Sequence, residues 1–262
     1  MTLSFDKYQG AGNDFIVLDG RRHLPVLSSE QIAALCHRRT GIGADGLMIL
    51  LSHPDYDFEM KYFNADGREG SLCGNGGRCL TRFASDLGMN KKEFRFLATD
   101  GAHEARLADD GWVHLRMLPV TSIEFRGSDA VLNTGSPHYI RLVDDVGQYP
   151  VVEEGKSIRY NNEFSSAGIN VNFVQRIPEG LKVRTYERGV EDETLSCGTG
   201  VTAAALACAS ATREQQHTAI FTRGGELAVH FTRTGEHSFD DIWLCGPAER
   251  VFTGTIEISS NI

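Results

Sequence analysis

The sequence is poor in the features that mark nucleic-acid-binding and membrane proteins. It holds 26 Lys and Arg against 35 Asp and Glu, for a net charge of −9. Because phosphate backbones are bound by clustered cations, this balance argues against a nucleic-acid partner. No apolar run approaches the roughly 20 residues of a membrane span, and the stretch 203–211 is too short. The first ten residues lack the apolar core of a signal peptide, so we expect a cytoplasmic protein without a membrane partner.

Cysteine is also scarce and irregularly spaced. Six cysteines in 262 residues are too few for a disulfide scaffold, and no Cys-x-x-Cys pair points to zinc. We therefore expect reduced thiols and no metal. Four cysteines stand in apolar stretches and are predicted to be small buried hydrophobes: Cys36, Cys79, Cys208 and Cys245.

What the chain does have is a large apolar fraction and many turn residues. Hydrophobic residues make up 41% and aromatic residues 9%, which suffices for a packed core. The 28 glycines indicate tight turns between short strands. At this length the chain forms one large domain or two ordinary ones.

One motif, Cys-Gly-x-Gly followed by a helix-compatible run, occurs twice. The first copy begins at Cys73 and the second at Cys197, 124 residues later (197 − 73). At the start of a helix, free N–H groups and the positive dipole end favour a thiolate. Two such cysteines half a chain apart indicate two lobes that serve one site.

The pattern around each motif predicts an internal duplication. Helices are expected from Ser28 or Ser29 through Cys36, from the first motif to Gly88, and over 198–210. Strands are expected at 5–9, 15–18, 47–51, 58–63, 94–98, 104–108, 112–118, 130–133, 139–143, 171–176, 182–186, 219–222, 226–232, 242–245 and 250–258. No element is assigned to 144–170.

This order predicts an α+β fold of two pseudo-repeated lobes, each a curved, mostly antiparallel sheet wrapped around a central helix. The expected N-terminal lobe spans 1–118 and the C-terminal lobe 119–250. Residues 119–127 are expected to cross between the lobes.

The motif admits three interpretations. In one, the glycines form a tight turn and the cysteine is inert. In another, the helix start binds a phosphate, but the chain lacks both the Gly-x-x-x-x-Gly-Lys-Ser/Thr and the strand-bounded Gly-x-Gly-x-x-Gly patterns. In the third, both helix starts hold one carboxylate, with a sulfur on each face of its α-carbon. One thiolate then removes the α-proton and the opposite thiol delivers another, which inverts the centre without a cofactor.

On eight sequence blocks the chain resembles the diaminopimelate epimerase family, whose fold is shared with proline racemases and phenazine-biosynthesis-like isomerases. The blocks are GAGNDF (10–15), GIGADG (41–46), FNADG (63–67), CGNGGRC (73–79), GSPH (135–138), NVNF (170–173), YERG (186–189) and CGTG (197–200). Two positions depart from the commonest family pattern: Gly46 stands where many members have glutamine, and Ser136 where many have asparagine.

The resemblance implies a PLP-independent interconversion of LL- and meso-diaminopimelate, toward lysine and peptidoglycan, by a homodimer without cofactors. By analogy Cys73 and Cys197 are the catalytic thiols. The backbone N–H groups of Gly74, Asn75, Gly198 and Thr199 are expected to bind the reacting carboxylate. The remaining amino and carboxyl groups of the substrate are expected to be held by Asn13, Asn64, Asn170, Glu187 and Arg188. His138 is expected to orient the thiols or support them electrostatically, with packing in a loop as the alternative.

Several simpler interpretations stay open. Asn13 and Asn64 both lie near glycine and serve equally well in turns, and Glu187-Arg188 is also compatible with an exposed charged pair. A racemase acting on proline or hydroxyproline is a second hypothesis, although proline has no distal charged group for Arg188. A non-catalytic amino-acid-binding protein is a third, although a binder has no use for paired thiols.

The resemblance also implies that the C-terminal strand, 251–262, completes the N-terminal lobe.

Overall fold

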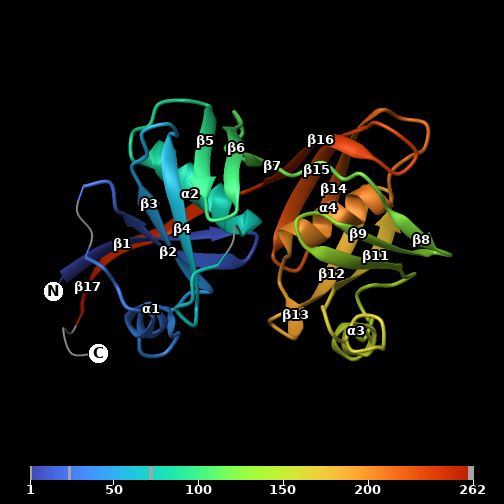
Figure 1. Ribbon diagram of the computed structural model, residues 1–262, viewed down its shortest axis with the longest axis horizontal. Coiled ribbons are helices and arrows are strands. Elements are labelled where there is room, and N and C mark those ends of the chain that lie inside the picture. Colours follow the sequence, from blue (N-terminus) through green and yellow to red (C-terminus); the bar gives the residue numbers. More distant parts are fainter. Residues whose placement is uncertain (1, 23–24, 71–72, 259–262) are drawn as a thin grey trace. The chain divides into compact units, whose positions relative to one another are not determined.

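A computed structural model describes residues 2–22, 25–70 and 73–258 (Figure 1). The chain divides into two compact units. The N-terminal unit comprises Met1–Leu115 and Pro247–Ile262, and the C-terminal unit comprises Arg116–Gly246. Of the expected C-terminal strand, residues 259–262 lie outside the described part of the chain.

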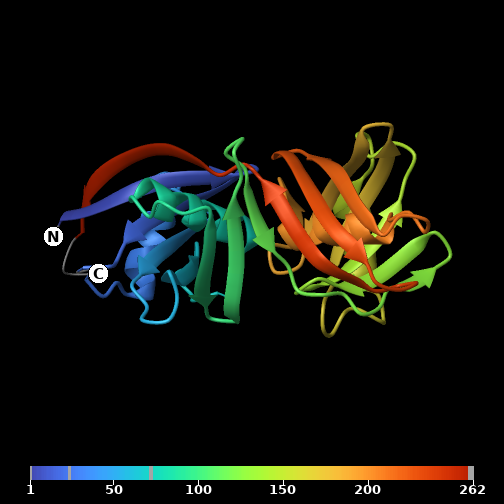
Figure 2. The ribbon, with the colours of Figure 1, turned by 90° about the horizontal axis from the view of Figure 1, so that it is seen from above.

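The N-terminal unit combines one sheet with two helices. Its strands are β1 (Thr2–Gly10), β2 (Asn13–Asp19), β3 (Gly46–Leu51), β4 (Phe58–Asn64), β5 (Glu93–Ala98), β6 (Gly101–Leu107), β7 (Val113–Arg116) and β17 (Glu249–Glu257). Its helices are α1 (Ser29–Cys36) and α2 (Gly74–Asp86). The sheet order is β17-β1-β2-β3-β4-β5-β6-β7, and β17 runs antiparallel beside β1 (Figure 2).

The C-terminal unit repeats this plan. Its strands are β8 (Glu124–Arg126), β9 (Asp129–Asn133), β10 (Pro137–Leu142), β11 (Asn170–Ile177), β12 (Gly180–Glu187), β13 (Asp192–Thr194), β14 (Gln215–Thr222), β15 (Gly225–Arg233) and β16 (Phe239–Gly246). Its helices are α3 (Val151–Arg159) and α4 (Gly198–Ala207). The sheet order is β8-β9-β10-β11-β12-β14-β15-β16, with the short β13 paired to β12.

The two sheets have the same sequence of pairings. In each, two antiparallel pairings are followed by a parallel, an antiparallel, a second parallel and two antiparallel pairings. Each parallel step is bridged by a helix, α1 and α2 in one unit and α3 and α4 in the other. The predicted α+β class and its duplicated, mostly antiparallel sheets are thus confirmed.

The strand register shows which residues correspond in the two units. Leu47 pairs with Phe63 in the N-terminal unit, and Val171 pairs with Tyr186 in the C-terminal unit. The residues next to these pairs, at the strand ends, therefore correspond as well. Gly46 corresponds to Asn170, and Asn64 corresponds to Glu187. The duplication maps candidate site positions onto one another.

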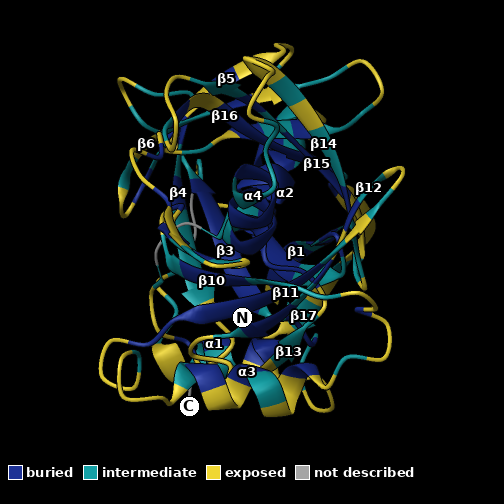
Figure 3. Ribbon diagram, turned by 90° about the vertical axis from the view of Figure 1, so that its right-hand side faces the viewer, coloured by how far each residue is buried: buried dark blue, intermediate teal, exposed yellow. Residues whose placement is uncertain are grey.

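Helices α2 and α4 are the buried cores of their units. The first turn of α2 begins at Gly74, and its buried residues include Cys79, Leu80 and Phe83. In α4 the run Val201–Leu206 is buried throughout, which the absence of large polar residues permits. Figure 3 shows both helices in the colour of buried residues, whereas α3 exposes its outer side.

The second glycine of each motif allows this close packing. A Cβ on Gly76 would lie 2.9 Å from Met48 Sδ, and one on Gly200 would lie 2.3 Å from Asn172 Oδ1. Any side chain there would push the helix away from its sheet.

Helices α1 and α3 cover the opposite sheet faces. A capping box formed by Ser28 and Gln31 starts α1, an arrangement that contributes about 1 kcal/mol. Its buried Ile32 and Leu35 join Ile16 and Leu18 of the sheet in one apolar cluster. The corresponding cluster beneath α3 contains Val151, Ile158, Val171, Phe173 and Tyr186.

Four sequence-based expectations were wrong in detail. Residues 144–170, which received no element, contain α3, and the expected crossing segment 119–127 contains β8. Helix α4 ends at Ala207 rather than at Ser210. Cys208 is half-buried rather than fully buried, because it lies at the C-cap beyond the last buried turn.

Helices long and apolar enough to cross a membrane do not occur within residues 2–22, 25–70 and 73–258.

Candidate active site

Cys73 is the N-cap residue of α2. Its backbone is extended (φ −93°, ψ 121°), and its carbonyl accepts the first helical hydrogen bond, from Gly77 N at 2.7 Å. The N–H groups of Gly74, Asn75 and Gly76 therefore have no acceptor within the helix. They form an anion-binding end beside a half-buried thiol.

The Cys73 sulfur lies next to a short chain of amides. Cys73 Sγ is 3.6 Å from Asn13 Oδ1, and Asn75 Nδ2 donates to the same oxygen at 3.4 Å. The fully buried Arg78 donates to Asn75 Oδ1 at 2.9 Å, while Asn13 Nδ2 donates to Asp45. Since a guanidinium only donates and a carboxylate only accepts, both amide orientations are determined. Asn13 thus turns its oxygen toward the thiol.

A partly exposed cluster of ion pairs lies next to Asn13 and includes its neighbour Asp14. Asp14 pairs with Lys7 at 2.7 Å and with Arg38 at 2.7 Å, and Arg38 also reaches Asp45 at 2.5 Å. Burial by itself would raise the pKa of Asp14, but the hydrogen bonds and charges of Arg38 and Lys7 outweigh it and lower the pKa to about 2. The strand end that carries Asn13 is thereby fixed.

Asn64 ends β4 and starts a turn. Its backbone N–H donates to Arg68 O at 2.9 Å, and Gly67 N donates to Asn64 O at 2.9 Å. Its side chain is exposed and lies 3.5 Å from Arg68 O. The turn interpretation therefore describes Asn64 in this structure, and the structure does not bring it into the Cys73–Asn13–Asn75 group.

Cys197 occupies in α4 the place that Cys73 occupies in α2. Its backbone is also extended (φ −122°, ψ 112°), and its carbonyl accepts from Val201 N at 2.9 Å. Its sulfur lies 3.5 Å from Thr199 Oγ1, and Thr199 O accepts from Thr134 at 2.8 Å. Cys197 is 7% exposed.

Asn170 and Arg188 are joined through Ser136. Asn170 Nδ2 donates to Ser136 Oγ at 2.9 Å and to Pro137 O at 3.1 Å, and Asn170 Oδ1 accepts from Arg188 N at 2.9 Å. The Arg188 guanidinium reaches Ser136 Oγ at 3.4 Å. Next to it, Glu187 accepts from Thr194 at 2.8 Å. The position that departs from the family pattern, Ser136, is thus the centre of a polar cluster.

His138 is completely buried in β10, directly after Pro137 of this cluster. Its Nδ1 lies 3.1 Å from Asn172 Nδ2, and its Nε2 is buried and has no hydrogen-bond partner among the described residues. Burial, assisted by the charge of Arg188, lowers the pKa of His138 to about 3. The ring is therefore neutral at physiological pH and supplies no positive charge to a thiolate.

The other thiols differ from the two motif cysteines. Burial raises the pKa of Cys79 to about 12 and that of Cys36 to about 11, and it also raises the pKa of Cys208. These groups stay protonated at neutral pH and are poor nucleophiles.

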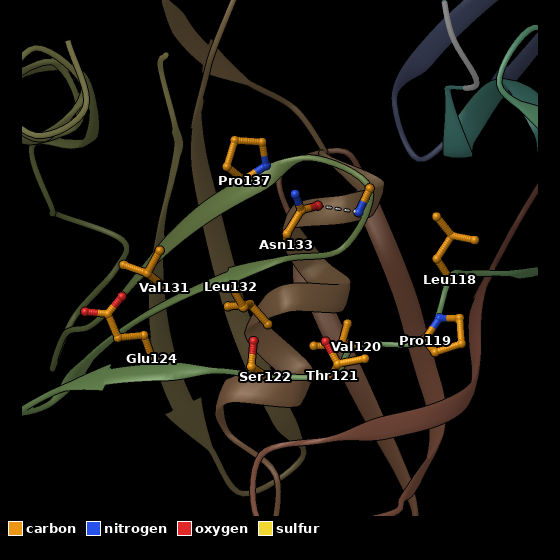
Figure 4. Close-up of a pocket in the computed structure, with 11 residues that line it drawn as sticks. Leu118, Pro119, Val120, Thr121, Ser122, Glu124, Val131, Leu132, Asn133 and Pro137 are labelled. Atoms are coloured by element: carbon orange, nitrogen blue, oxygen red, sulfur yellow. Dashed lines mark hydrogen bonds between the residues drawn. The ribbon is translucent and has the colours of Figure 1, made fainter. Parts of the chain in front are cut away.

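A pocket of about 490 Å³ lies in the C-terminal unit, where Gly135 and Pro137 bring its wall next to Ser136 (Figure 4). Its wall is formed by residues 118–122, Glu124, Val131–Asn133, Gly135 and Pro137. Glu124 is its one titratable lining residue, so it offers no acid–base pair. In each unit the candidate site is the start of the central helix with its motif cysteine.

Two parts of the site were missed from the sequence. Asp45, which orients Asn13, lies in a quoted block but was read as part of a glycine-rich loop. Asn172 shares a strand face with Asn170 because strand side chains alternate with a period of two. That alternation is the sequence signal that could have identified Asn172.

Comparisons with known proteins match this chain to one family over most of its length. The sequence model described as "Diaminopimelate epimerase" matches residues 5–122 and 130–251. A diaminopimelate epimerase of Flavobacterium psychrophilum is 46% identical over 254 residues, covering 95% of this chain and 98% of the relative. One from Chlorobaculum tepidum is 45% identical over 264 residues, covering 95% and 99%.

Solved structures share the fold at low sequence identity. A Bacillus anthracis phenazine biosynthesis protein of the PhzF family superposes with a TM-score of 0.76 at 15% identity, covering 98% of this chain and 100% of that chain. A hydroxyproline epimerase from Agrobacterium vitis gives a TM-score of 0.67 at 15% identity, covering 99% and 94%.

Proposed function

Because this chain belongs to the diaminopimelate epimerase family, a family of isomerases, we propose that it interconverts LL- and meso-2,6-diaminopimelate by a two-base mechanism without PLP. The observation that carries the mechanism is the matched placement of Cys73 and Cys197. Each is the N-cap of a central helix, in units that share one pairing sequence.

The chemistry assigns one proton transfer to each thiol. A thiolate takes the α-proton, so that the C–H bond breaks and an S–H bond forms. The opposite thiol then gives its proton to the other face of the carbon and becomes the thiolate. The proposed reaction therefore requires the two sulfurs to lie at opposite faces of one α-carbon.

The helix starts supply the electrostatic part. In the proposal, the N–H groups of Gly74 and Asn75 and those of Gly198 and Thr199 bind the reacting carboxylate. Negative charge builds on that carboxylate as the proton leaves, and N–H dipoles fixed in advance stabilise it. The glycines contribute by letting the ligand approach the backbone closely.

The distal half of the substrate carries one carboxylate and one ammonium group. We assign the carboxylate to the Arg188 guanidinium and to amide N–H groups, and the ammonium to Glu187 and amide oxygens, with Asn13, Asn64 and Asn170 as the amides. The links of Ser136 to Asn170 and Arg188 support this assignment, since they already orient two of these groups.

We further propose a cytoplasmic homodimer. The mechanism needs reduced thiols, which the cytoplasm maintains, and the dimer follows from the family resemblance. Light scattering of the reduced protein measures the second point directly.

The test of the proposed reaction is isotope exchange. Purified, reduced protein in D₂O is expected to place deuterium at the α-carbon of LL-diaminopimelate while the meso isomer appears. L-Proline and trans-4-hydroxy-L-proline serve as matched substrates and are expected to show no exchange. Exchange on either of them but not on diaminopimelate would favour a proline-type racemase, and no exchange on any would favour a binding protein.

A further inference from the structure

The layer beneath each central helix has a corresponding set of three side chains in the two units. In the N-terminal unit Phe15 lies opposite Gly46, and Met48 lies opposite Tyr62. In the C-terminal unit the same register places His138 opposite Asn170, and Asn172 opposite Thr185. The corresponding triplets are Phe15, Met48 and Tyr62 in one unit and His138, Asn172 and Thr185 in the other.

Both triplets lie against the first turn of the central helix. The Cβ position of Gly76 is 2.9 Å from Met48 Sδ and 3.5 Å from Cys73 Cβ. That of Gly200 is 2.3 Å from Asn172 Oδ1 and 3.3 Å from Cys197 Cβ. The central side chain of each triplet is therefore a near neighbour of the motif cysteine in its own unit.

The two triplets differ in chemistry. Phe15 and Tyr62 meet edge to face, with ring centroids 6.2 Å apart, and Met48 is fully buried beside them. In the C-terminal unit the same three positions are joined by hydrogen bonds. Because the layer under α2 contains neither an amide nor a histidine, the amide–histidine layer under α4 is not a requirement of the fold. Buried polar groups are costly, which indicates that this layer has another use.

The hydrogen bonds determine how the Asn172 amide is oriented. Its Nδ2 lies 3.2 Å from Tyr139 O, which can only accept, and its Oδ1 lies 2.9 Å from the Thr185 hydroxyl. The amide nitrogen therefore faces Tyr139 O and His138 Nδ1, and the hydroxyl donates to the amide oxygen. All four residues are buried.

This orientation determines the tautomer of His138. Asn172 Nδ2 carries its second hydrogen toward His138 Nδ1, so Nδ1 accepts and the ring proton is on Nε2. That N–H is buried, and the described part of the chain places no acceptor within hydrogen-bond distance of it. An orphaned donor of this kind costs free energy in the resting protein unless another state uses it.

We propose that Asn172 and Thr185 are positioning residues, which hold His138 as a neutral Nε2–H donor for the reaction on the Cys197 side. The Phe15 triplet contains no histidine, so the two halves of the duplicated site are chemically unequal. This inference rests on the proposed function, but its structural part, the tautomer, is measurable without any substrate.

The first measurement is the ¹⁵N spectrum of the histidine rings in the full chain. Among nine histidines, the His138 signals are assigned by their loss in His138→Gln. We expect the Nε2–H pattern of a neutral ring, unchanged from pH 5 to pH 9. In Asn172→Asp an accepting carboxylate faces Nδ1, so the proton is expected on Nδ1. A wild-type ring that is protonated on Nδ1, or a pattern that Asn172→Asp leaves unchanged, overturns the inference.

The second measurement is the epimerisation rate. Asn172→Asp is expected to lower kcat roughly tenfold or more, as loss of a histidine's orienting partner does elsewhere, with KM changed less than about threefold. Thr185→Ser keeps the hydroxyl and is expected to retain activity, whereas Thr185→Val is expected to lower kcat less than Asn172→Asp does. Met48→Leu, the corresponding substitution in the N-terminal unit, is the matched control and is expected to retain wild-type kcat.

The outcomes separate the two proposals. Absence of exchange in the wild type refutes the proposed function while the tautomer spectrum is still informative. Full activity in Asn172→Asp with a shifted tautomer refutes the positioning role while the epimerase function stands. A loss of kcat in Thr185→Ser equal to that in Thr185→Val would also refute it, because the hydroxyl would then be irrelevant.

Discussion

Tyr62 occupies the space that a side chain at Gly46 would need. A Cβ at position 46 would lie 2.6 Å from Tyr62 Cε2 and equally close to the backbone oxygen of Phe63. The glycine that departs from the commoner family residue is thus matched to a neighbouring ring in this chain. The presence of glycine at position 46 on β3 is therefore coupled to the presence of Tyr62 on β4.

We expect Gly46→Ala to destabilise the protein by about 1–3 kcal/mol, the usual cost of overpacking a buried site. In a Tyr62→Ala background, Gly46→Ala is expected to cost less stability because the ring is gone. Part of the cost is expected to remain, since the Phe63 carbonyl oxygen still lies in the way, and a double-mutant cycle measures the difference. Urea unfolding measures both. Gly147→Ala is the control: it is exposed, and its Cβ would meet a carboxylate oxygen of Asp145 at 3.1 Å. Equal effects of the two alanines would contradict the packing argument.

The Asp14 cluster predicts a loss of stability in acid. Its folded pKa of about 2 is below the ordinary value of 3.8, so its ion pairs stabilise the folded state fully above pH 4. This contribution is lost as the pH falls from about 4 to 2. After allowance for partial exposure, it is on the order of 1–2 kcal/mol.

Asp14→Asn is therefore expected to be less stable than the wild type at pH 7. This gap, the difference between their free energies of unfolding, is expected to narrow toward pH 2. Lys7, which is 5% exposed, adds to the gap because its charge loses a buried partner. Asp109→Asn, which breaks an exposed pair with Lys92, is the control and should have no measurable effect. A gap that stays constant from pH 7 to pH 2 would show that the Asp14 charge is not responsible.

His138 predicts a second, separate pH dependence. Its folded pKa of about 3 is below the ordinary value of 6.5. Between these values the unfolded chain binds a proton that the folded chain does not, so stability falls as the pH falls below 6.5. The slope is about 1.4 kcal/mol per pH unit, or roughly 3 kcal/mol between pH 6.5 and pH 4.

A His138→Gln variant lacks this component. Its stability curve from urea unfolding is expected to be flatter than that of the wild type between pH 6.5 and pH 4, whatever its stability at neutral pH. Parallel curves would mean that His138 is protonated in the folded state, which would also remove the neutral donor from the C-terminal unit.

The repeated motif allowed much of the fold to be predicted, but local signals failed where packing decides. Helix α3 has no side-chain cap at Pro150, and Gly155 in its middle argues against a helix. In the structure a Cβ on Gly155 would lie 2.4 Å from Tyr186 Cβ, so the glycine is what lets α3 lie on the sheet. A contact between residues 31 positions apart (186 − 155) leaves no local pattern.

The candidate site, like the fold, was only partly predicted from the sequence. Cys73 and Cys197 were identified because their repeat is visible in the sequence, and the register places them at corresponding helix starts. The contrast between Met48 and Asn172 was not identified, since it emerges only when the strand registers of the two units are aligned. Their neighbours in sequence share no recognisable pattern, although both side chains contact the second glycine of a motif.

The two motif cysteines should also be separable from the other thiols by reactivity and by mutation. At pH 8 a thiol with a pKa of about 12 is ionised to about one part in ten thousand, so Cys79 should resist iodoacetamide in the folded protein. Cys73 and Cys197, at helix starts, are expected to be alkylated faster and to be protected by a bound substrate analogue. Mass spectrometry of tryptic peptides measures the order.

Mutation completes this test of the mechanism. Cys73→Ala and Cys197→Ala are each expected to lose epimerisation by several orders of magnitude while keeping the circular dichroism spectrum of the wild type. Cys208→Ala, at a half-buried thiol outside both motifs, is the matched control and is expected to stay active. Since epimerisation needs an acid and a base on opposite faces, either single alanine must stop it. Turnover near the wild-type rate in one of the two motif variants would therefore exclude the two-base mechanism, even if the protein were still an epimerase.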